Sequence, residues 1–450
     1  YGDTIPNYGG HKRSRFNPGE GYDYELVNTE VLLGLEVRNG KIFNPRNKAE
    51  FSLLALTEEY EIHPKVLAKL EQMVNEGASI TGPKPIRIAP ERNRKGLPDM
   101  NGWKPFNNAT YKPGDRAIYY NASIEELLNA LNVYPDFDYK DKGFYTLDYT
   151  HYQKGGMDFY FLVNTTDTWM SRNLKFRQYD KIPALWNPEN GKITDISVYE
   201  ESEKGISLPM TLAPHESVFV VFQKGSNPEH YTKIKHNGIH PPQLRYTENG
   251  IEFWEEGDFG LIKGKNLLEP STTLHREEIK GAWEVYFPEG FGAPEKAIFP
   301  KLKSWTESAI EGVKYFSGTA RYEKQFIHKM HASDFPESRI YLDLGDLSHV
   351  AELWLNDKPL GITWAKPYRF DVTEVLKPGI NTIKIEVANT WSNRLTGDAL
   401  TGEQFTKTHV AATVIKGIPK LRVPWENAPL IPSGIFGPVT ITTVLPIVAP

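Results

Sequence analysis

From about residue 140 onward the chain presents short strand-like segments in succession, and helical periodicity disappears. The clearest segment is 382–388, in which Ile383, Ile385 and Val387 occupy one face and polar side chains occupy the other. Such alternation is typical of a strand with one buried face. Turn residues separate the segments, as at 377–379 (KPG). This pattern restricts residues 275–443 to an antiparallel β-sandwich, which we predict to be a jelly roll.

The first part of the chain has a different pattern. Residues 64–76 form an amphipathic helical segment between short apolar runs at 49–56 and 78–82. Strand, helix and strand at this spacing predict a βαβ unit with a parallel sheet. A second helix is expected at 123–132, where Ser123 and Glu126 form a capping box. These elements predict a flavodoxin-like or amidotransferase-like α/β layer.

A chain of 450 residues is too long for one hydrophobic core. We predict an α/β domain at 1–138, whose first strand is missing, and a small antiparallel β domain at 139–226. A bridging β segment at 227–272 contains an expected hairpin at 252–257, and the β-sandwich occupies 273–450. The fold class is therefore multidomain, α/β plus all-β.

Composition excludes several classes of function. The chain has no cysteine, so disulfides, cysteine nucleophiles and cysteine metal sites are excluded. The net charge is −5 and no basic stripe is present, which argues against nucleic acid as a partner. No apolar run reaches the length of a membrane span. Ten Trp and 23 Tyr are compatible with carbohydrate binding, although sandwich cores also use aromatic residues.

A polar segment, 389–398, follows the strand at 382–388. It brings together Trp391, Asn393, Arg394 and Asp398, and we expect it to form a loop. An indole stacks on a sugar ring, and the polar side chains bond sugar hydroxyls, so one interpretation is a substrate or rim contact. The alternative is a structural corner, in which Arg394 pairs with Asp398 and Trp391 fills a gap between the sheets.

Two further groups are weaker candidates. Tyr22 and Asp23 lie near the expected carboxyl edge of the α/β sheet, where ligands bind; packing of this segment against another domain is the alternative. Asp343 and Asp346, with Glu352, are candidate calcium ligands, although ordinary surface charge is the favoured interpretation of these carboxylates. The pair His328 and His331 has no supporting carboxylates for a metal site.

Several blocks of the chain resemble a known family. Residues 283–287 (WEVYF), 315–322 (YFSGTARY), 351–356 (AELWLN), 376–381 (LKPGIN), 389–398 (NTWSNRLTGD) and 432–438 (PSGIFGP) resemble the galactose-binding-like jelly roll of family 2 glycoside hydrolases and family 106 α-L-rhamnosidases. Residues 21–33 (GYDYELVNTEVLL) and 74–83 (VNEGASITGP) resemble the α/β region of the family 106 enzymes.

This resemblance implies an inverting glycoside hydrolase that acts on a rhamnose-containing glycan, with two catalytic carboxylates on a barrel upstream of this region. Neither carboxylate has a matching position here, so we assign no catalytic residue to this chain. We expect the chain to be the C-terminal accessory portion of such an enzyme, partnered by its catalytic barrel. The resemblance also implies calcium as a cofactor, a role in polysaccharide degradation, and a periplasmic or extracellular bacterial location. The alternatives are a non-catalytic carbohydrate-binding protein or the accessory domains of a family 2-type β-glycosidase.

Overall fold

The fold was analysed in a computed structural model of the chain. It describes residues 21–56, 61–85, 87–88, 102–107, 111–112, 115, 117–139, 146–226, 229–269, 274–329, 337–406, 412–414 and 422–448. The chain divides into two compact units. The first comprises residues 1–140, 174–179 and 202–207, and the second comprises 141–173, 180–201 and 208–450.

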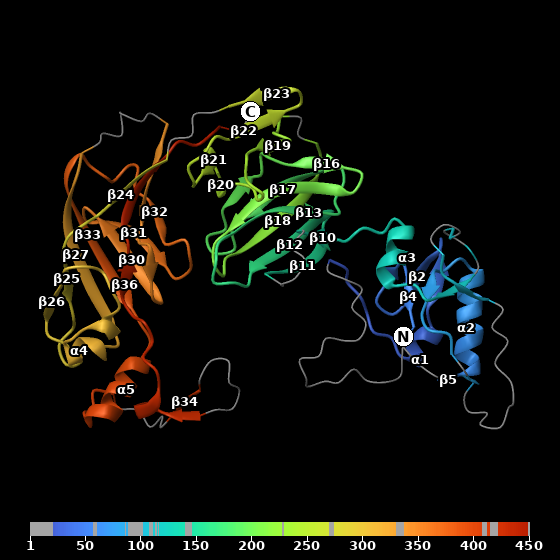
Figure 1. The fold of residues 1–450 in the computed structure, drawn as a ribbon, viewed down its shortest axis with the longest axis horizontal. Helices are drawn as coiled ribbons and strands as arrows, with labels where there is room; N and C mark the ends of the chain where they lie inside the picture. Colours follow the sequence, from blue (N-terminus) through green and yellow to red (C-terminus); the bar gives the residue numbers. More distant parts are fainter. Residues whose placement is uncertain are drawn as a thin grey trace. The chain divides into compact units, whose positions relative to one another are not determined.

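The first unit contains a small parallel sheet, in the blue to cyan part of Figure 1. Its strand order is β4-β6-β9-β8. Its strands are β4 (Leu54–Ala55), β6 (Ile80–Thr81), β9 (Ile118–Tyr120) and β8 (Trp103–Pro105), and all three pairings are parallel. A further parallel pair joins β5 (Glu61–Ile62) to β7 (Arg87–Ile88). The predicted parallel pairing is therefore present, whereas the flavodoxin-like or amidotransferase-like identity of this layer stays a prediction.

The two predicted amphipathic helices are also present in this unit. Helix α2 (Pro64–Asn75) begins after the His63 N-cap with Pro64 in its first turn, where proline costs no hydrogen bond. Its buried residues are those of the predicted face: Val66, Leu67, Leu70, Met73 and Val74. Helix α3 (Ile124–Ala130) has the predicted capping box, in which the Glu126 backbone N–H donates to Ser123 Oγ at 3.1 Å.

One strand prediction in this unit is wrong. Residues 49–56 were expected to form a single buried strand, but they form β3 (Ala49–Phe51) and β4, which belong to different sheets. Strand β3 pairs with β2 (Lys41–Asn44), which pairs with β1 (Glu36–Arg38), in an antiparallel meander. The apolar run in the sequence could not reveal this change of sheet, because both halves are apolar and each half packs in a different sheet. A short helix, α1 (Thr29–Leu33), precedes this meander and is capped by Asn28.

The small β domain is built on a five-stranded antiparallel sheet in the second unit. Its order is β11-β12-β18-β14-β15: Leu147–Lys154, Met157–Asn164, Ser217–Lys224, Lys181–Trp186 and Ile193–Asp195. A second sheet has the order β10-β13-β17-β16: Phe137–Asp138, Met170–Phe176, Gly205–Leu212 and Glu200–Ser202.

The bridging segment forms two small antiparallel sheets. One contains β19 (Lys233–Lys235), β22 (Gly260–Lys263) and β23 (Asn266–Leu268), and the other is a hairpin of β20 (Leu244–Thr247) and β21 (Gly250–Phe253). The expected hairpin therefore exists, but its turn falls at 248–249 rather than within 252–257. Gly250 has φ +123°, and a Cβ there would lie 2.1 Å from the Ile447 carbonyl oxygen, so the turn requires glycine.

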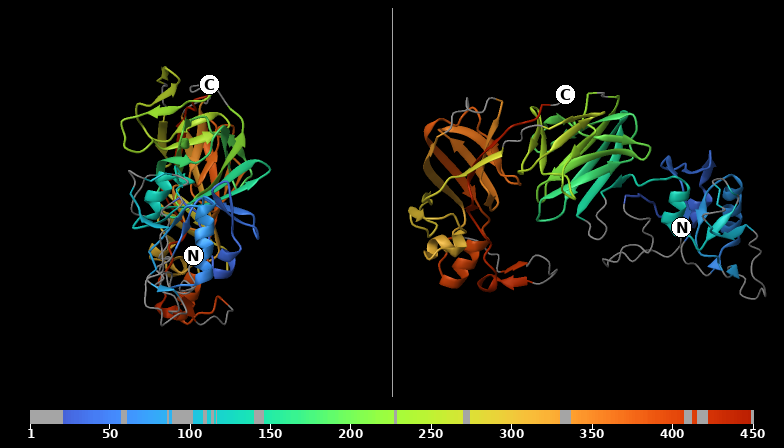
Figure 2. Two further views of the ribbon diagram at one scale, coloured as in Figure 1. Left: turned by 90° about the vertical axis from the view of Figure 1, so that its right-hand side faces the viewer. Right: turned by 45° about the horizontal axis from the view of Figure 1, so that its top comes forward.

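The carboxyl-terminal part is a sandwich of two antiparallel sheets, which Figure 2 shows as two layers. The six-stranded sheet has the order β26-β25-β27-β33-β30-β31: Lys296–Phe299, Trp283–Tyr286, Thr319–His328, Gly379–Ala388, Val350–Leu355 and Lys358–Thr363. The four-stranded sheet has the order β24-β37-β28-β32: Leu274–Glu278, Thr440–Val444, Arg339–Asp343 and Arg369–Asp371. Their inner faces form one core that includes the predicted Ile383, Ile385 and Val387. The expected β-rich, multidomain character is confirmed.

Shorter elements close one end of the sandwich. They are β29 (Asp346–Leu347) with β36 (Ile435–Gly437), η1 (Trp305–Glu307), α4 (Glu311–Lys314), α5 (Ser392–Thr401), β34 (Ala412–Val414) with β35 (Arg422–Pro424), and η3 (Trp425–Asn427). Within the described part of the chain, no helix has the length and apolar character needed to cross a membrane.

Candidate functional site

The segment that follows β33 is a helix, so the prediction of a loop at 389–398 is wrong. Strand β33 ends at Ala388, and α5 begins at Ser392 with Trp391 as its N-cap residue. Gly402 ends the helix in the left-handed conformation, at φ 75°. The sequence concealed this helix because its buried face is polar: Asn393, Arg394, Thr396 and Gly397. Apolar periodicity, the usual signal of a helix, is therefore missing.

Two asparagine side chains fasten the start of α5 to the sandwich. Asn389 Nδ2 donates to the Phe316 carbonyl at 3.0 Å and to Ser433 Oγ at 2.9 Å. Asn393 is 1% exposed; its amide donates to the Ile431 carbonyl at 2.7 Å and accepts from the Ile431 backbone N–H at 2.7 Å. These bonds satisfy the side chain internally, so Asn393 has no face available to a sugar.

Arg394 and Asp398 are also directed inward. Arg394 is 1% exposed, and its Nε donates to Asp398 Oδ1 at 2.8 Å. The guanidinium lies 4.6 Å from the ring centre of Phe405. Asp398 Oδ2 accepts two further bonds, from the backbone N–H and the hydroxyl of Thr406. The pairing of Arg394 with Asp398 that the structural alternative predicted is therefore present. Both carboxylate oxygens of Asp398 are bonded within the chain and Arg394 is buried, so nothing in the structure supports the predicted rim contact for this pair.

Trp391 differs from its neighbours because its side chain is at the surface. It is 51% exposed, so the alternative in which it fills a gap between the sheets is wrong. Phe291 supports one side of it, with ring centres 6.1 Å apart and an angle of 41° between the planes. Of the four residues predicted in this segment, Trp391 keeps an exposed surface on which a sugar ring could stack.

Tyr22 and Asp23 belong to the first unit, whereas the α5 segment belongs to the second. Tyr22 Oη donates to the Val133 carbonyl at 3.1 Å, and burial raises the pKa of the phenol. Asp23 Oδ1 accepts from the Tyr24 backbone N–H at 2.8 Å. Both interactions order the local backbone, and neither shows a ligand role.

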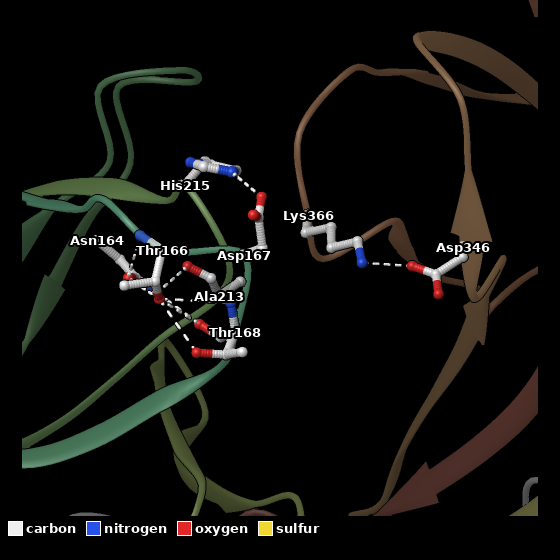
Figure 3. A network of polar contacts seen from close by, with 8 residues as sticks. All are labelled: Asn164, Thr166, Asp167, Thr168, Ala213, His215, Asp346 and Lys366. Atoms are coloured by element: carbon white, nitrogen blue, oxygen red, sulfur yellow. Dashed lines mark hydrogen bonds and ion pairs between the residues drawn. The ribbon is translucent and has the colours of Figure 1, made fainter. Parts of the chain in front are cut away.

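The calcium candidates are engaged by cations. Asp343 Oδ2 accepts from Arg369 Nε at 2.6 Å, and Asp346 forms an ion pair with Lys366 (Figure 3). Glu352 faces Glu386 across two strands of the six-stranded sheet. Among the residues that the structure describes, no group of three or more His, Asp or Glu side chains has the arrangement of a metal site. His331 lies outside the described residues.

A polar network orders the loop between β12 and β13 in the same unit (Figure 3). Asn164 Nδ2 donates to the carbonyls of Thr168 and Ala213, both at 2.8 Å, and its Oδ1 accepts from Thr166 Oγ1 at 2.8 Å. At the edge of this network His215 and Asp167 form an exposed pair at 2.7 Å. Asn164 is fully buried, so its role is to hold the loop.

A buried cluster that sequence reasoning missed joins the β20–β21 hairpin to the sandwich. Glu252 is 1% exposed; its carboxylate accepts from Tyr341 Oη at 2.6 Å and from Trp254 Nε1 at 3.3 Å. Burial raises the pKa of Glu252. Trp254 also stacks on the Arg369 guanidinium, at 3.7 Å from its ring centre. The block 252–257 signalled a hairpin in the sequence, but not its partner in the sandwich, because Tyr341 lies 89 residues from Glu252 along the chain.

Comparison with known proteins identifies two regions of this chain. Residues 6–201 match the family model described as alpha-L-rhamnosidase of glycoside hydrolase family 106. Residues 310–425 match the model of the glycosyl hydrolase 2 galactose-binding domain-like family. These matches confirm the resemblance found in the sequence: residues 6–201 are similar to family 106 α-L-rhamnosidases, and residues 310–425 are similar to the galactose-binding-like domain of family 2.

A solved rhamnosidase from Novosphingobium sp. PP1Y has a similar fold, with a TM-score of 0.65 and 28% sequence identity. The similarity covers 91% of this chain and 35% of that chain. A curated protein of Formosa agariphila, named "Putative beta-glucuronidase", is 23% identical over 94% of this chain and 53% of its own length. The chain thus spans about half of that relative and about a third of the solved rhamnosidase.

Proposed function

We propose that this chain is the accessory portion of an α-L-rhamnosidase-like, inverting glycoside hydrolase, and that the catalytic carboxylates belong to a portion outside it. The observation that carries the proposal is the similarity to the Novosphingobium rhamnosidase, which extends over 91% of this chain but 35% of that enzyme. The two family matches support the same assignment.

The contacts of two carboxylates, Glu252 and Asp398, support this division of labour. An inverting glycosidase needs two carboxyl groups about 6.5–9.5 Å apart, with a water and a sugar between them. Glu252 has the raised pKa expected of a general acid, but it is 1% exposed and bonded to Tyr341 and Trp254. Asp398 is held by Arg394 and Thr406. Neither carboxylate can contact a sugar without losing these bonds.

Trp391 is the residue we assign to carbohydrate. Its half-exposed indole stands at the start of α5 and is supported by Phe291. The partly buried Asn389 and the buried Asn393 hold the helix start in place. An indole fixed in this way can stack on a sugar ring with little loss of side-chain entropy. Calcium binding, a role in polysaccharide degradation and a periplasmic or extracellular location remain predictions from the family resemblance.

The test compares the 450-residue chain with the complete enzyme, which includes the catalytic portion. We expect hydrolysis of 4-nitrophenyl α-L-rhamnoside by the complete enzyme and none by the chain alone. Hydrolysis by the chain alone would refute the division of labour. Aryl β-glucuronide is assayed in parallel, because the name of the Formosa relative and the galactose-binding-like domain raise a β-glycosidase as an alternative.

A second candidate function is a non-catalytic carbohydrate-binding protein. The exposed Trp391–Phe291 pair favours it, because such a pair can bind sugar without any reaction. Binding of the isolated chain to immobilised glycans, lost in Trp391→Ala, would support this candidate. Absence of binding, together with rhamnosidase activity in the complete enzyme, would count against it.

A further inference from the structure

The five-stranded sheet of the small β domain is apolar on both faces. In β12, Tyr160 and Leu162 are fully buried on the core side. The alternate positions, Phe159 and Phe161, point to the opposite face. A half-buried antiparallel sheet would carry polar residues there, so this face departs from the usual pattern of a sheet with one face in water.

A row of apolar side chains crosses all five strands on this outer face. Residues that pair across neighbouring strands point to the same face of the sheet. From β11 to β15 across the sheet, one row of such pairs consists of Thr150, Phe161, Phe219, Trp186 and Ile193. The next row joins Tyr152, Phe159, Val221 and Ala184. We refer to these two rows as the outer aromatic face.

The aromatic rings of this face pack on one another. Phe161 and Phe219 have ring centres 4.8 Å apart, and Tyr152 stacks on Phe159 at 4.9 Å with 5° between the planes. Trp186 contacts Phe159 edge-on at 5.7 Å. The rings thus cover Phe159, which is 7% exposed, but Tyr152 and Ile193 remain 46% and 58% exposed.

Charged residues border the outer aromatic face. Asp148 and Lys154 lie at exposed positions of β11, and Asp195 lies at an exposed position of β15. An apolar centre with a charged rim is the usual anatomy of a protein–protein interface. Phe161, Trp186 and Phe219 are partly exposed between the exposed Tyr152 and Ile193, and a partly exposed group of apolar side chains of this size is uncommon on a surface that stays in water.

We propose that the outer aromatic face is the docking surface for the catalytic portion of the same enzyme. The inference rests on the proposed function and adds to it the surface at which the two portions meet. The partner is a protein surface, because Phe161 and Phe219 at the centre of the face carry no hydrogen-bonding group and the indole N–H of Trp186 is buried. The hydroxyl groups of the face, those of Thr150 and Tyr152, lie on the edge strand β11, whereas a sugar platform needs such groups beside the rings. The two relatives supply the candidate occupant, since 53% and 35% of their lengths match this chain and the rest has no counterpart in it.

Hydroxyl-radical footprinting tests the proposal on two preparations, the 450-residue chain and the complete enzyme. We expect Tyr152 and Trp186 to react in the chain alone and to be protected about five-fold or more in the complete enzyme. Trp283, which is 1% exposed in the sandwich core, serves as the slow reference in both. Equal reactivity of Tyr152 and Trp186 in the two preparations would overturn the proposal.

Variants provide an independent readout. Tyr152→Glu and Ile193→Glu alter side chains that are about half exposed, so the melting temperature of the isolated chain should hardly change. In the complete enzyme each should lower the melting temperature or release the catalytic portion to proteolysis, and an unchanged complete enzyme would refute docking here.

If something other than the catalytic portion covers the outer aromatic face, footprinting gives a different result, and each such result would overturn the proposal. Protection already present in the isolated chain at low concentration means that the chain itself covers the face. Protection that grows with chain concentration means a second copy, and protection by added rhamnogalacturonan means a glycan. Failure of the proposed function would appear separately, as rhamnoside hydrolysis by the isolated chain.

Discussion

The buried Glu252–Tyr341 contact yields the sharpest prediction. Tyr341→Phe removes the hydroxyl that donates to Glu252 Oε1 at 2.6 Å and leaves Trp254 Nε1, at 3.3 Å, as the donor to a carboxylate that is 1% exposed. A hydrogen bond to a charged group contributes about 1.5–3 kcal/mol. We expect a loss of about 2 kcal/mol, which corresponds to a fall of roughly 3–4 °C in melting temperature for the second unit, which comprises about 300 residues.

The matched control is Tyr286→Phe. Tyr286 Oη donates to Glu284 Oε2 at 2.8 Å, so the same atom is removed from the same kind of bond, but Glu284 is on the surface. We expect no measurable change in melting temperature, because water replaces the hydroxyl there. If differential scanning calorimetry gives equal shifts for the two variants, burial does not strengthen the Glu252 contact and the reasoning fails.

The pH dependence of the same contact follows from the raised pKa of Glu252, which desolvation causes. Hydrogen bonds from Tyr341 and Trp254, and the charges of Asp371 and Arg245, also act on this carboxyl. The folded state binds the proton more tightly than the unfolded state, so this contribution to stability is complete below the ordinary glutamate pKa and is lost as pH rises through the folded value. Glu252→Gln should therefore gain stability relative to the wild type as pH rises from 4 to 8, and a constant difference across this range would contradict the argument.

Three further predictions concern α5. Trp391→Ala should leave the melting temperature of the isolated chain unchanged, because the side chain is 51% exposed, and should raise the KM of the complete enzyme several-fold; a fall in melting temperature alone would remove Trp391 from the carbohydrate site. Asn393→Ala should cost about 1–3 kcal/mol in urea denaturation, because it removes the acceptor of the Ile431 backbone N–H and leaves Ser433 Oγ as the donor to the Ile431 carbonyl; a loss near zero would show that water replaces the amide. Gly397→Ala should cost about 1–3 kcal/mol, since a Cβ there would lie 2.5 Å from Arg394 Nη2 and 2.6 Å from Tyr315 Cβ; unchanged stability would mean that the arginine can shift.

Local patterns predicted the elements whose signals are contained in a few consecutive residues. Helix α2 follows from five apolar residues at helical spacing with Pro64 at the start, and α3 follows from its capping box. The face of β33 that enters the core follows from alternation alone. Each of these signals depends on the chain's own periodicity, so no distant partner is needed to interpret it.

The candidate site was harder to predict, because its chemistry depends on which way each side chain points. The sequence places Trp391, Asn393, Arg394 and Asp398 within eight residues, and composition alone suggests that they act together. The helix instead turns Asn393 and Arg394 inward, 1% exposed, and leaves Trp391 at the surface. A polar helix face that packs against backbone groups of a distant segment has no signature in the sequence.

The sequence by itself determined the β-rich sandwich, the two amphipathic helices, the absence of cysteine chemistry and the resemblance to rhamnosidases. Each of these depends on composition, on short-range periodicity or on motifs. Only the tertiary structure decided that Glu252 is sealed against Tyr341 and that the outer aromatic face crosses five strands. The physical reason is that burial and strand register join residues far apart in the chain, and those contacts decide whether a polar group is satisfied internally or available to a ligand.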